Sequence, residues 1–182
     1  MTQIRQTDTK AYIKQALTQL LAETDFERLT VSHITKKAGI NRGTFYLHYT
    51  DKYDLIQQLK EDTLSHIEDS LEAYRANPKT GILSMLTYLQ SDFAFISTIS
   101  RVSFINFSES IKDFTFRVLS QDNQLETILT QSYQIPYTYA LEVYLSSIES
   151  LIRLWIERGA LESPEEMADI IFTVAWSGLN SD

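Results

Sequence analysis

The sequence predicts an all-α protein, and three observations support this prediction. Glycine and proline are scarce, with 5 and 3 residues among 182, although strands joined by tight turns need many of both. Apolar residues recur at helical spacing along most of the chain. Residues that start or stop helices, such as Thr, Asn, Pro and Gly, separate these periodic segments. We expect an N-terminal three-helix unit that contains a helix-turn-helix, followed by a larger helical domain.

Composition excludes several classes of protein. There is no cysteine, which excludes disulfide frameworks, thiolate nucleophiles and cysteine zinc sites. The histidines, at 33, 48 and 66, lack metal-ligand spacing, and we expect neither a metal nor a cofactor. No Ser-His-Asp order, carboxylate pair or phosphate-binding glycine loop appears, so we do not expect an enzyme. Without an apolar signal region or an apolar run of about 20 residues, we expect a cytoplasmic protein without membrane contact.

The first helix is expected over residues 8–24, where apolar side chains fall on one face at helical spacing. Thr7 or Asp8 can cap its start. The residues on its apolar face are Ile13, Ala16, Leu17, Leu20 and Leu21.

A helix-turn-helix is expected over about residues 30–49. Thr30 can cap a first helix of barely two turns by accepting a hydrogen bond from a first-turn amide. That helix ends at Gly39, because glycine best tolerates the left-handed conformation that ends a helix. Asn41 can cap the second helix, over residues 42–49. Two short helices joined by a glycine-containing turn of this length are typical of a helix-turn-helix.

The second helix of this motif has one core face and an otherwise polar surface. Phe45 and Tyr49 lie four residues apart and share the core face. Arg42 and Tyr46 lie on another side, rich in hydrogen-bond donors.

The rest of the chain is also expected to be helical. Asp51 caps a helix that runs from Lys52 to about Tyr74, and Asn77-Pro78 ends it. Ile135-Pro136 marks a later start, since proline fits a first helical turn. Further helices are expected near residues 79–90, 91–106, 108–131, 136–158 and 163–179.

Charge is unevenly distributed along the chain. Residues 1–60 carry nine basic and six acidic groups, a net charge of +3. The remaining residues carry seven basic and eighteen acidic groups, a net charge of −11, within a total of −8. A basic N-terminal block on an acidic body predicts that the N-terminal unit meets a polyanion.

One stretch matches a family pattern. Residues Ala38 to Leu55 meet A-G-(I/V)-x-x-G-T-(F/L)-Y-x-H-(F/Y)-x-x-K-x-x-L, and the stretch from Thr30 to Ile56 resembles the TetR family of bacterial transcription regulators. Tyr49 stands where the family usually has Phe, and Leu47 where an aromatic residue is common. Residues 150–171 resemble the terminal dimerising helices of a TetR subgroup that includes regulators linked to dihydroxyacetone kinase.

The resemblance implies a DNA-binding domain over residues 1–54 and a C-terminal effector-binding and dimerisation domain over residues 55–182. Its recognition helix would enter the major groove with the N-terminal end at the bases, where Arg42 can contact guanine. Gly43 would let the backbone approach the DNA, and Leu47 would touch a thymine methyl. The residues expected to contact phosphates are Thr44, Tyr46, His48 and Lys52. The full set of expected DNA-contacting residues is Thr30, Ser32, His33, Lys36, Asn41, Arg42, Gly43, Thr44, Tyr46, Leu47, His48 and Lys52.

The C-terminal domain yields two further predictions. Its aromatic residues are expected to form core between helices, and the resemblance adds a pocket for a small apolar or aromatic effector. Glu149 and Arg153, four residues apart, are expected to form a surface or interface ion pair. The candidate effector-binding residues are Tyr88, Phe104, Phe107, Arg153 and Trp155. The candidate dimer-interface residues are Leu141, Tyr144, Leu145, Ile148, Ile152, Trp155, Met167, Ile170, Ile171 and Val174.

We therefore expect a sequence-specific transcriptional regulator. The predicted mechanism is that of a ligand-responsive repressor, which binds a palindromic double-stranded DNA operator as a homodimer in the bacterial cytoplasm. The alternative is a TetR-like activator or coactivator that acts through a protein partner, like the regulators linked to dihydroxyacetone kinase.

Overall fold

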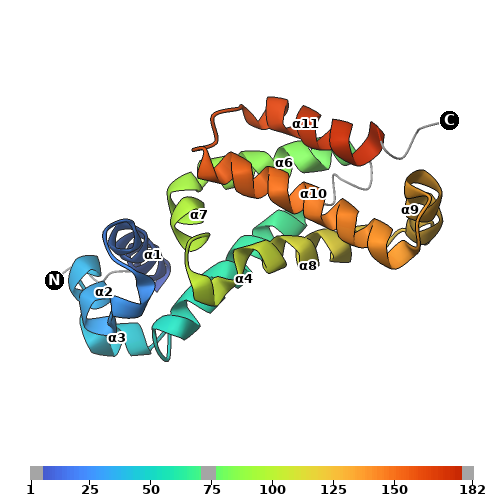
Figure 1. The fold of residues 1–182 in the computed structure, drawn as a ribbon. Coiled ribbons are helices and arrows are strands. Elements are labelled where there is room, and N and C mark those ends of the chain that lie inside the picture. Colours follow the sequence, from blue (N-terminus) through green and yellow to red (C-terminus); the bar gives the residue numbers. More distant parts are fainter. Residues whose placement is uncertain (1–5, 71–76, 178–182) are drawn as a thin grey trace. The chain divides into compact units, whose positions relative to one another are not determined.

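The computed structural model describes residues 6–70 and 77–177, which form helices and turns with no strand among them (Figure 1). The predicted all-α fold is confirmed. With η for a 3-10 helix, the elements in chain order are α1 (Gln6–Glu23), η1 (Phe26–Arg28), α2 (Val31–Ala38), α3 (Arg42–Tyr46), α4 (Lys52–Ser70), α6 (Pro78–Ser91), α7 (Phe93–Ile99), η2 (Ser103–Ile105), α8 (Phe107–Leu119), α9 (Leu125–Tyr133), α10 (Tyr137–Glu157) and α11 (Pro164–Ser177).

The chain divides into two compact units, and the division falls within α4. Unit 1 comprises Met1–Ser65 and Ala94–Ile105, and unit 2 comprises His66–Phe93 and Asn106–Asp182. The boundary predicted after residue 54 differs from this division. The reason is that Leu55 and Ile56, just beyond it, are completely buried, so the first part of α4 contributes to the core of unit 1.

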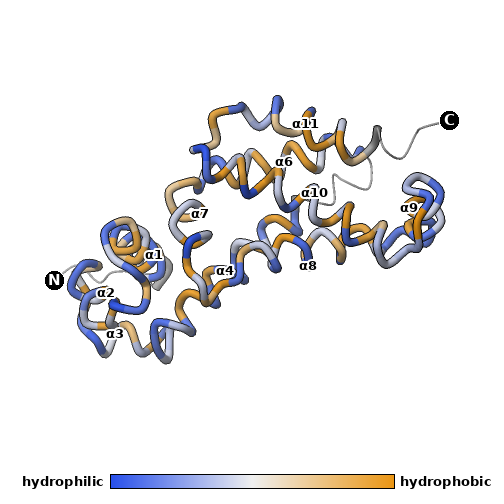
Figure 2. The backbone as a smooth tube through the Cα atoms, in the orientation of Figure 1, coloured by the Kyte–Doolittle hydropathy of each residue, from blue (hydrophilic) through white to orange (hydrophobic). Residues whose placement is uncertain are grey.

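The core of unit 1 is formed by one apolar face from each of its short helices. Ile13 and Leu17 lie one turn apart on α1 and are fully buried, as the sequence predicted. Ile34 of α2 and Phe45 of α3 are likewise fully buried. Figure 2 shows the apolar positions of these helices alternating with polar positions along each one, as the amphipathic pattern requires.

A later segment of the chain, α7 with η2, belongs to unit 1 as well. Phe95 and Ile96 of α7 are buried, and the Lys14 ammonium of α1 lies 4.4 Å from the centre of the Phe95 ring. Lys60 of α4 donates a hydrogen bond to the carbonyl oxygen of Ile105 at 3.3 Å. Unit 1 therefore includes a segment that comes from a distant place in the sequence, beyond the first 54 residues.

In unit 2, α10 packs against three other helices. It lies against α8, α9 and α11, and α11 also packs along α6 (Figure 1). Tyr144 and Trp155 of α10 are each only 2% exposed. Burial on several sides explains why α10 carries so many apolar residues.

Two predicted helices are interrupted in the structure. The helix expected over residues 91–106 is α7 followed by η2, and hydroxyl groups near the end of α7 bond to carbonyls of the preceding turn, as Thr98 does with Phe95 at 2.8 Å. The helix expected over residues 108–131 is split into α8 and α9. The segment between them is polar, and the Asp122 carboxylate accepts from the Gln124 amide at 2.8 Å, which favours a turn.

Three smaller predictions concern helix ends. Thr7 and Asp8 lie inside α1, so neither caps its start. Asn77 accepts a hydrogen bond from the Thr80 amide at 3.2 Å and caps α6, in which Pro78 takes the first position. The predicted end of the fourth helix near Tyr74 lies outside the described residues, as does the end of the last predicted helix at residue 179.

Among the described residues, no single helix has both the length and the apolar character needed to cross a membrane. Only α6 and α7 taken together across their bend meet that criterion, which buried core helices also meet.

Candidate nucleic-acid interface

The first helix of the helix-turn-helix, α2, has the ends that the sequence predicted. The Thr30 hydroxyl accepts a hydrogen bond from the His33 amide at 3.2 Å, which satisfies one free donor of the first turn. Gly39 ends the helix at φ +69°, in the left-handed region where a residue with a side chain is strained. These two residues set the length of α2 and the direction in which the chain leaves it.

The second helix, α3, is built around its cap. The Asn41 side-chain oxygen accepts from the Thr44 amide at 2.7 Å and from the Thr44 hydroxyl at 3.1 Å. A Cβ atom at Gly43 would lie 3.1 Å from that same oxygen, which is tighter than an ordinary contact. Gly43 was predicted to let the backbone approach DNA, and the structure adds a local reason for glycine, because a side chain would crowd the cap.

Arg42 and Tyr46 form a pair on the outer side of α3. An Arg42 guanidinium nitrogen, Nη2, donates to the Tyr46 hydroxyl at 3.1 Å, and the guanidinium carbon lies 5.8 Å from the centre of the Tyr46 ring. Both side chains are exposed, Tyr46 at 49%. The side of α3 that carries Arg42 and Tyr46 therefore faces outward, as predicted.

Most of the residues predicted to contact DNA lie at the surface of unit 1. Nine of the twelve are exposed, and Thr44, His48 and Lys52 are half-buried. Leu47, predicted to touch a thymine methyl, is 80% exposed although it is apolar. The helix is shorter than the predicted 42–49, because regular structure ends at Tyr46 and a turn follows.

The opposite side of α3 is core, as predicted. Phe45 is fully buried and Tyr49 is 2% exposed, and their ring centres lie 5.5 Å apart. The Tyr49 hydroxyl is buried and has no hydrogen-bond partner in the described part of the chain. Burial raises the pKa of Tyr49 to about 12. Tyr49 is therefore a packing residue with a polar atom that the core does not satisfy.

Lys52 has a different set of partners from the one predicted. Its ammonium donates to the carbonyl oxygens of Phe26 and Glu27, both at 2.9 Å, and lies 4.7 Å from the centre of the Phe26 ring. Two of its three N–H donors are thus used at the end of η1. We predicted a phosphate contact, but in the structure Lys52 joins α4 to the corner between α1 and α2.

A cluster of aromatic rings in unit 1 was not predicted. Tyr53 lies edge-on to Phe26 at 5.4 Å between ring centres, and Phe104 of η2 contacts Tyr53 at 5.1 Å. The Tyr53 hydroxyl donates to Glu27 at 3.1 Å. Phe104, a candidate effector residue, therefore belongs to unit 1. The cluster was missed because its members are far apart in the sequence and share no local pattern.

No group of three or more His, Asp or Glu side chains within the described ranges is arranged to hold a metal ion.

Two family models match this chain. Residues 13–59 match the model described as bacterial regulatory proteins, tetR family, which contains the helix-turn-helix and its cap residues. Residues 76–176, more than half of the chain, match the model of a transcriptional regulator C-terminal region that bears the TetR name. The chain belongs to the TetR family. The first model is one of bacterial regulatory proteins, and the residues that it matches form the helix-turn-helix of the structure.

Relatives of this TetR-family chain include two regulators of Bacillus subtilis (strain 168). The uncharacterized HTH-type transcriptional regulator YxbF is 26% identical over 90% of this chain, and the match spans 43% of YxbF. The uncharacterized HTH-type transcriptional regulator YvdT is 37% identical over 33% of this chain and 31% of its own length. Each match thus spans less than half the length of the relative.

Solved structures share the fold of this TetR-family chain. The dihydroxyacetone kinase operon activator DhaS aligns with a TM-score of 0.67 at 20% identity, over 94% of this chain and 96% of DhaS. A putative TetR-family regulator from Syntrophomonas wolfei aligns with a TM-score of 0.67 at 19% identity, over 97% and 99% of the two chains. The fatty acid degradation regulator FadR from Bacillus halodurans gives 0.63 at 17% identity, over 95% of both chains. At these identities the likeness concerns the fold alone.

The residues predicted to form the dimer interface are mostly core. Seven of the ten are buried within the chain, Leu141 is half-buried, and Ile170 and Val174 are exposed. The apolar side chains that α10 and α11 leave exposed are Tyr139, Val143, Leu154, Ile170 and Val174. Because α10 has apolar residues on several sides, the sequence does not show which side its own subunit covers and which side stays free for a second copy.

Two of the candidate effector residues have partners within unit 2. Tyr88 stacks on His66, with ring centres 5.5 Å apart, and the indole nitrogen of Trp155 donates to the carbonyl oxygen of Glu162 at 3.0 Å. Trp155 is thus a buried core residue with its one donor satisfied. Of the other candidates, Arg153 belongs to a polar cluster that includes Ser108, the residue after Phe107.

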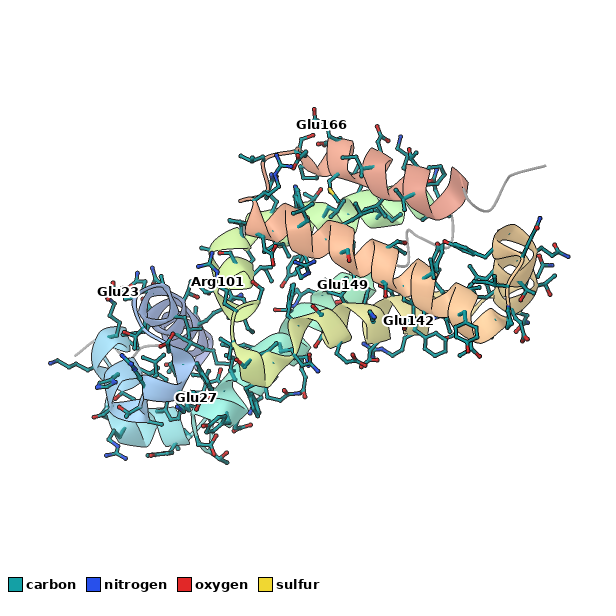
Figure 3. All side chains as sticks on the ribbon, in the orientation of Figure 1. Glu23, Glu27, Arg101, Glu142, Glu149 and Glu166 are labelled. Atoms are coloured by element: carbon teal, nitrogen blue, oxygen red, sulfur yellow. The ribbon has the colours of Figure 1, made fainter. Side chains whose placement is uncertain are left out.

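That cluster is centred on Glu149 of α10. Glu149 is only 7% exposed, and its carboxylate accepts from the Ser108 hydroxyl at 2.7 Å and from Arg153 Nε at 3.2 Å. Figure 3 shows Glu149 on the side of α10 that faces α8. Arg153 also pairs with Glu157 at 2.9 Å. The predicted ion pair is present, but its acidic partner is buried within unit 2 rather than at a surface.

Proposed function

We propose that this TetR-family chain is a ligand-responsive repressor that binds a palindromic operator as a homodimer in the bacterial cytoplasm. The observation that carries the proposal is the exposed Arg42–Tyr46 pair, which spans α3, a helix that Phe45 anchors in the core. A rigid helix that presents hydrogen-bond donors at its N-terminal end has the form that reads base edges in a major groove.

The homodimer is supported by the apolar surface that α10 and α11 leave exposed. Tyr139, Val143 and Leu154 lie within one face of α10, at spacings of four and eleven residues, and Ile170 and Val174 lie one turn apart on α11. Exposed apolar side chains on adjacent helices favour a contact with a second copy. A two-fold contact of this kind gives the symmetry that a palindromic site requires.

Ligand response is supported by the buried acidic cluster of unit 2. A charged carboxylate inside a largely apolar unit is costly unless it is paired, and Glu149 uses Ser108 and Arg153 for this. We propose that a small apolar effector with one polar group binds beside this cluster, near Phe107. Because the division between the two units falls within α4, movement of α4 can couple this site to α3. The effector must bind one state of the dimer better than the other.

Selection of duplexes from a randomised pool by the purified protein tests the DNA-binding part of this proposal. We expect enrichment of an inverted repeat whose half-site centres lie about 10 base pairs apart or a multiple of that spacing. Affinity should fall steeply as salt increases, because phosphate contacts release counterions. Selection only in the presence of a partner protein would favour the coactivator alternative, and a flat response to salt would contradict direct binding.

The dimer is tested by sedimentation of Val174→Glu against a matched control. A buried glutamate would oppose association, so we expect the variant to sediment as a monomer and to lose affinity for the repeat. The control is Thr127→Glu, which adds the same charge at an exposed position of α9. A Val174→Glu protein that remains dimeric would show that the contact lies elsewhere.

A further inference from the structure

Tyr46 contacts the residue expected to read a base. The Tyr46 hydroxyl accepts a hydrogen bond from Arg42 Nη2 at 3.1 Å, although DNA is absent from the structure. The two residues lie four apart, the spacing at which side chains meet on one side of a helix. A hydroxyl that only contacts a phosphate would have no need to bind the neighbouring guanidinium.

The backbone of α3 that carries this pair is held in place by local contacts. Asn41 caps α3 through both the amide and the hydroxyl of Thr44, and Gly43 leaves room for that cap. Phe45 anchors the other side of the helix in the core, with a ring edge-on to the Tyr46 ring at 5.6 Å between centres. The Tyr46 ring therefore packs against a buried neighbour, and its hydroxyl offers a hydrogen-bond acceptor to the long, flexible Arg42 side chain.

We infer that Tyr46 is a positioning residue that determines sequence specificity by orienting the guanidinium of Arg42 before DNA is bound. This inference rests on the proposed function, in which α3 reads base edges. An arginine has five N–H donors in a planar fork, and Tyr46 uses one of them. The remaining donors suffice for a two-pronged contact with guanine. The hydroxyl hydrogen of Tyr46 stays available to a phosphate.

Orientation of Arg42 and contact with a phosphate have different consequences for Tyr46→Phe. Loss of a phosphate contact weakens binding to every sequence by the same factor. Loss of the hydroxyl that holds Arg42 weakens binding most where Arg42 meets its preferred base pair, and least where that base pair has been changed. The variant should therefore lose discrimination at one position of the half-site, by about twofold to tenfold, the range expected for one hydrogen bond.

A double-mutant cycle measures this coupling. The proteins are the wild type, Arg42→Ala, Tyr46→Phe and the double variant. The probes are a duplex that the wild type selects from a randomised pool and the same duplex with each half-site base pair changed in turn. Arg42→Ala should abolish discrimination at one base pair, and Tyr46→Phe should reduce it at that same base pair. In the Arg42→Ala background, Tyr46→Phe should cause no further loss of discrimination.

Tyr12→Phe is the matched control, since Tyr12 of α1 is exposed at 46% and loses the same hydroxyl. It should leave the discrimination pattern unchanged, and thermal unfolding should show that all variants are folded. If Tyr46→Phe lowers affinity equally for every duplex, or lowers discrimination equally with and without Arg42, the inference is wrong while the proposed function stands. If the wild type enriches no sequence at all, the proposed function fails, and the inference fails with it.

Discussion

The two units use their basic side chains differently. Among the described residues of unit 2, most of these side chains, with the exception of Arg158, are paired with carboxylates: Lys112 lies 2.6 Å from Glu142, and Arg117 lies 3.1 Å from Glu68. Lys79 likewise pairs with Asp169. The cations of unit 2 thus neutralise acids of the same unit.

In the helix-turn-helix of unit 1, cations are exposed and unmatched. Lys36, Lys37 and Arg42 form no ion pair with a carboxylate in the described part of the chain, and all three are exposed. Arg42 instead donates to the neutral hydroxyl of Tyr46. A polyanion can meet these side chains without breaking an ion pair. The net charge of an acidic protein therefore says little about where it binds DNA, because the local potential depends on how charges of both signs are distributed over the surface.

The sharpest test of this comparison replaces one arginine in each unit. Arg42→Ala should lower affinity for the selected operator by about tenfold to a hundredfold, because a two-pronged arginine–guanine contact is worth about 1–3 kcal/mol. Arg117→Ala removes a cation that already serves Glu68 and should change affinity by less than twofold. Fluorescence anisotropy at one fixed salt concentration measures both. Equal losses of affinity in the two variants would contradict the difference between the basic side chains of the two units.

Salt dependence separates a free cation from an occupied one within unit 1. Lys36→Gln should reduce the slope of log affinity against log salt by about 1, as expected when one phosphate contact is lost. Lys52→Met should leave that slope unchanged, because its ammonium is held by the carbonyl oxygens of Phe26 and Glu27. Lys52→Met should instead lower thermal stability. If Lys52→Met also reduced the slope, Lys52 would be one of the phosphate-contacting residues.

The buried hydroxyl of Tyr49 extends the comparison to the cores, since the buried carboxylate of Glu149 in unit 2 is paired. Tyr49→Phe removes a polar atom without a partner and should be neutral or stabilising by up to about 1 kcal/mol. Urea unfolding measures the change, with Tyr12→Phe as the exposed control. A clear loss of stability would show that the hydroxyl has a partner.

The same variant makes a prediction for alkaline pH. Burial raises the pKa of Tyr49 to about 12 in the folded protein, whereas an unfolded tyrosine has a pKa of about 10. The unfolded chain therefore loses this proton first, so the wild type should lose stability as pH rises from about 10 towards 12. Tyr49→Phe should lose less over that range. If the two proteins lost the same amount of stability over that pH range, the Tyr49 pKa would not be raised.

The smallest expected effect concerns the exposed pair of Lys112 and Glu142. The hydrogen bond from Lys112 lowers the pKa of Glu142, so the contribution of this pair to stability is present above the unfolded pKa of about 4.3 and is lost as pH falls through the lower folded value. Glu142→Gln should cause a slight loss in melting temperature at pH 7, reduced by salt and absent in acid. Glu126→Gln, at an exposed position of α9, is the control. A loss that persists in acid would have another origin.

Local signals predicted the helix-turn-helix well. Thr30, Asn41 and Gly39 act through hydrogen bonds or backbone angles within three residues of themselves, so their roles follow from the order of residues alone. The outward face of α3 followed from a similar argument, since Arg42 and Tyr46 lie four residues apart and share a side that differs from that of the buried Phe45. The contact between Arg42 and Tyr46 was within reach of the same spacing argument but needed side-chain positions to be seen.

Long-range contacts were not predictable in this way. The ammonium of Lys52 bonds to the backbone carbonyls of Phe26 and Glu27, about 25 residues earlier in the sequence, and no local pattern indicates these partners. Phe104 is an exposed aromatic residue of η2, and no sequence pattern links it to Phe26 and Tyr53.

The order of residues by itself determined the all-α class, the caps of α2 and α3, and the separation of a core face from a donor-rich face on α3. These properties depend on interactions within one or two helical turns, which can be inferred from the order of residues. Only the tertiary structure decided that α7 and η2 complete unit 1, and that the apolar side chains of α10 serve mainly its own subunit. An apolar helix face is equally well covered by its own chain or by a second copy, and the choice depends on how distant helices pack.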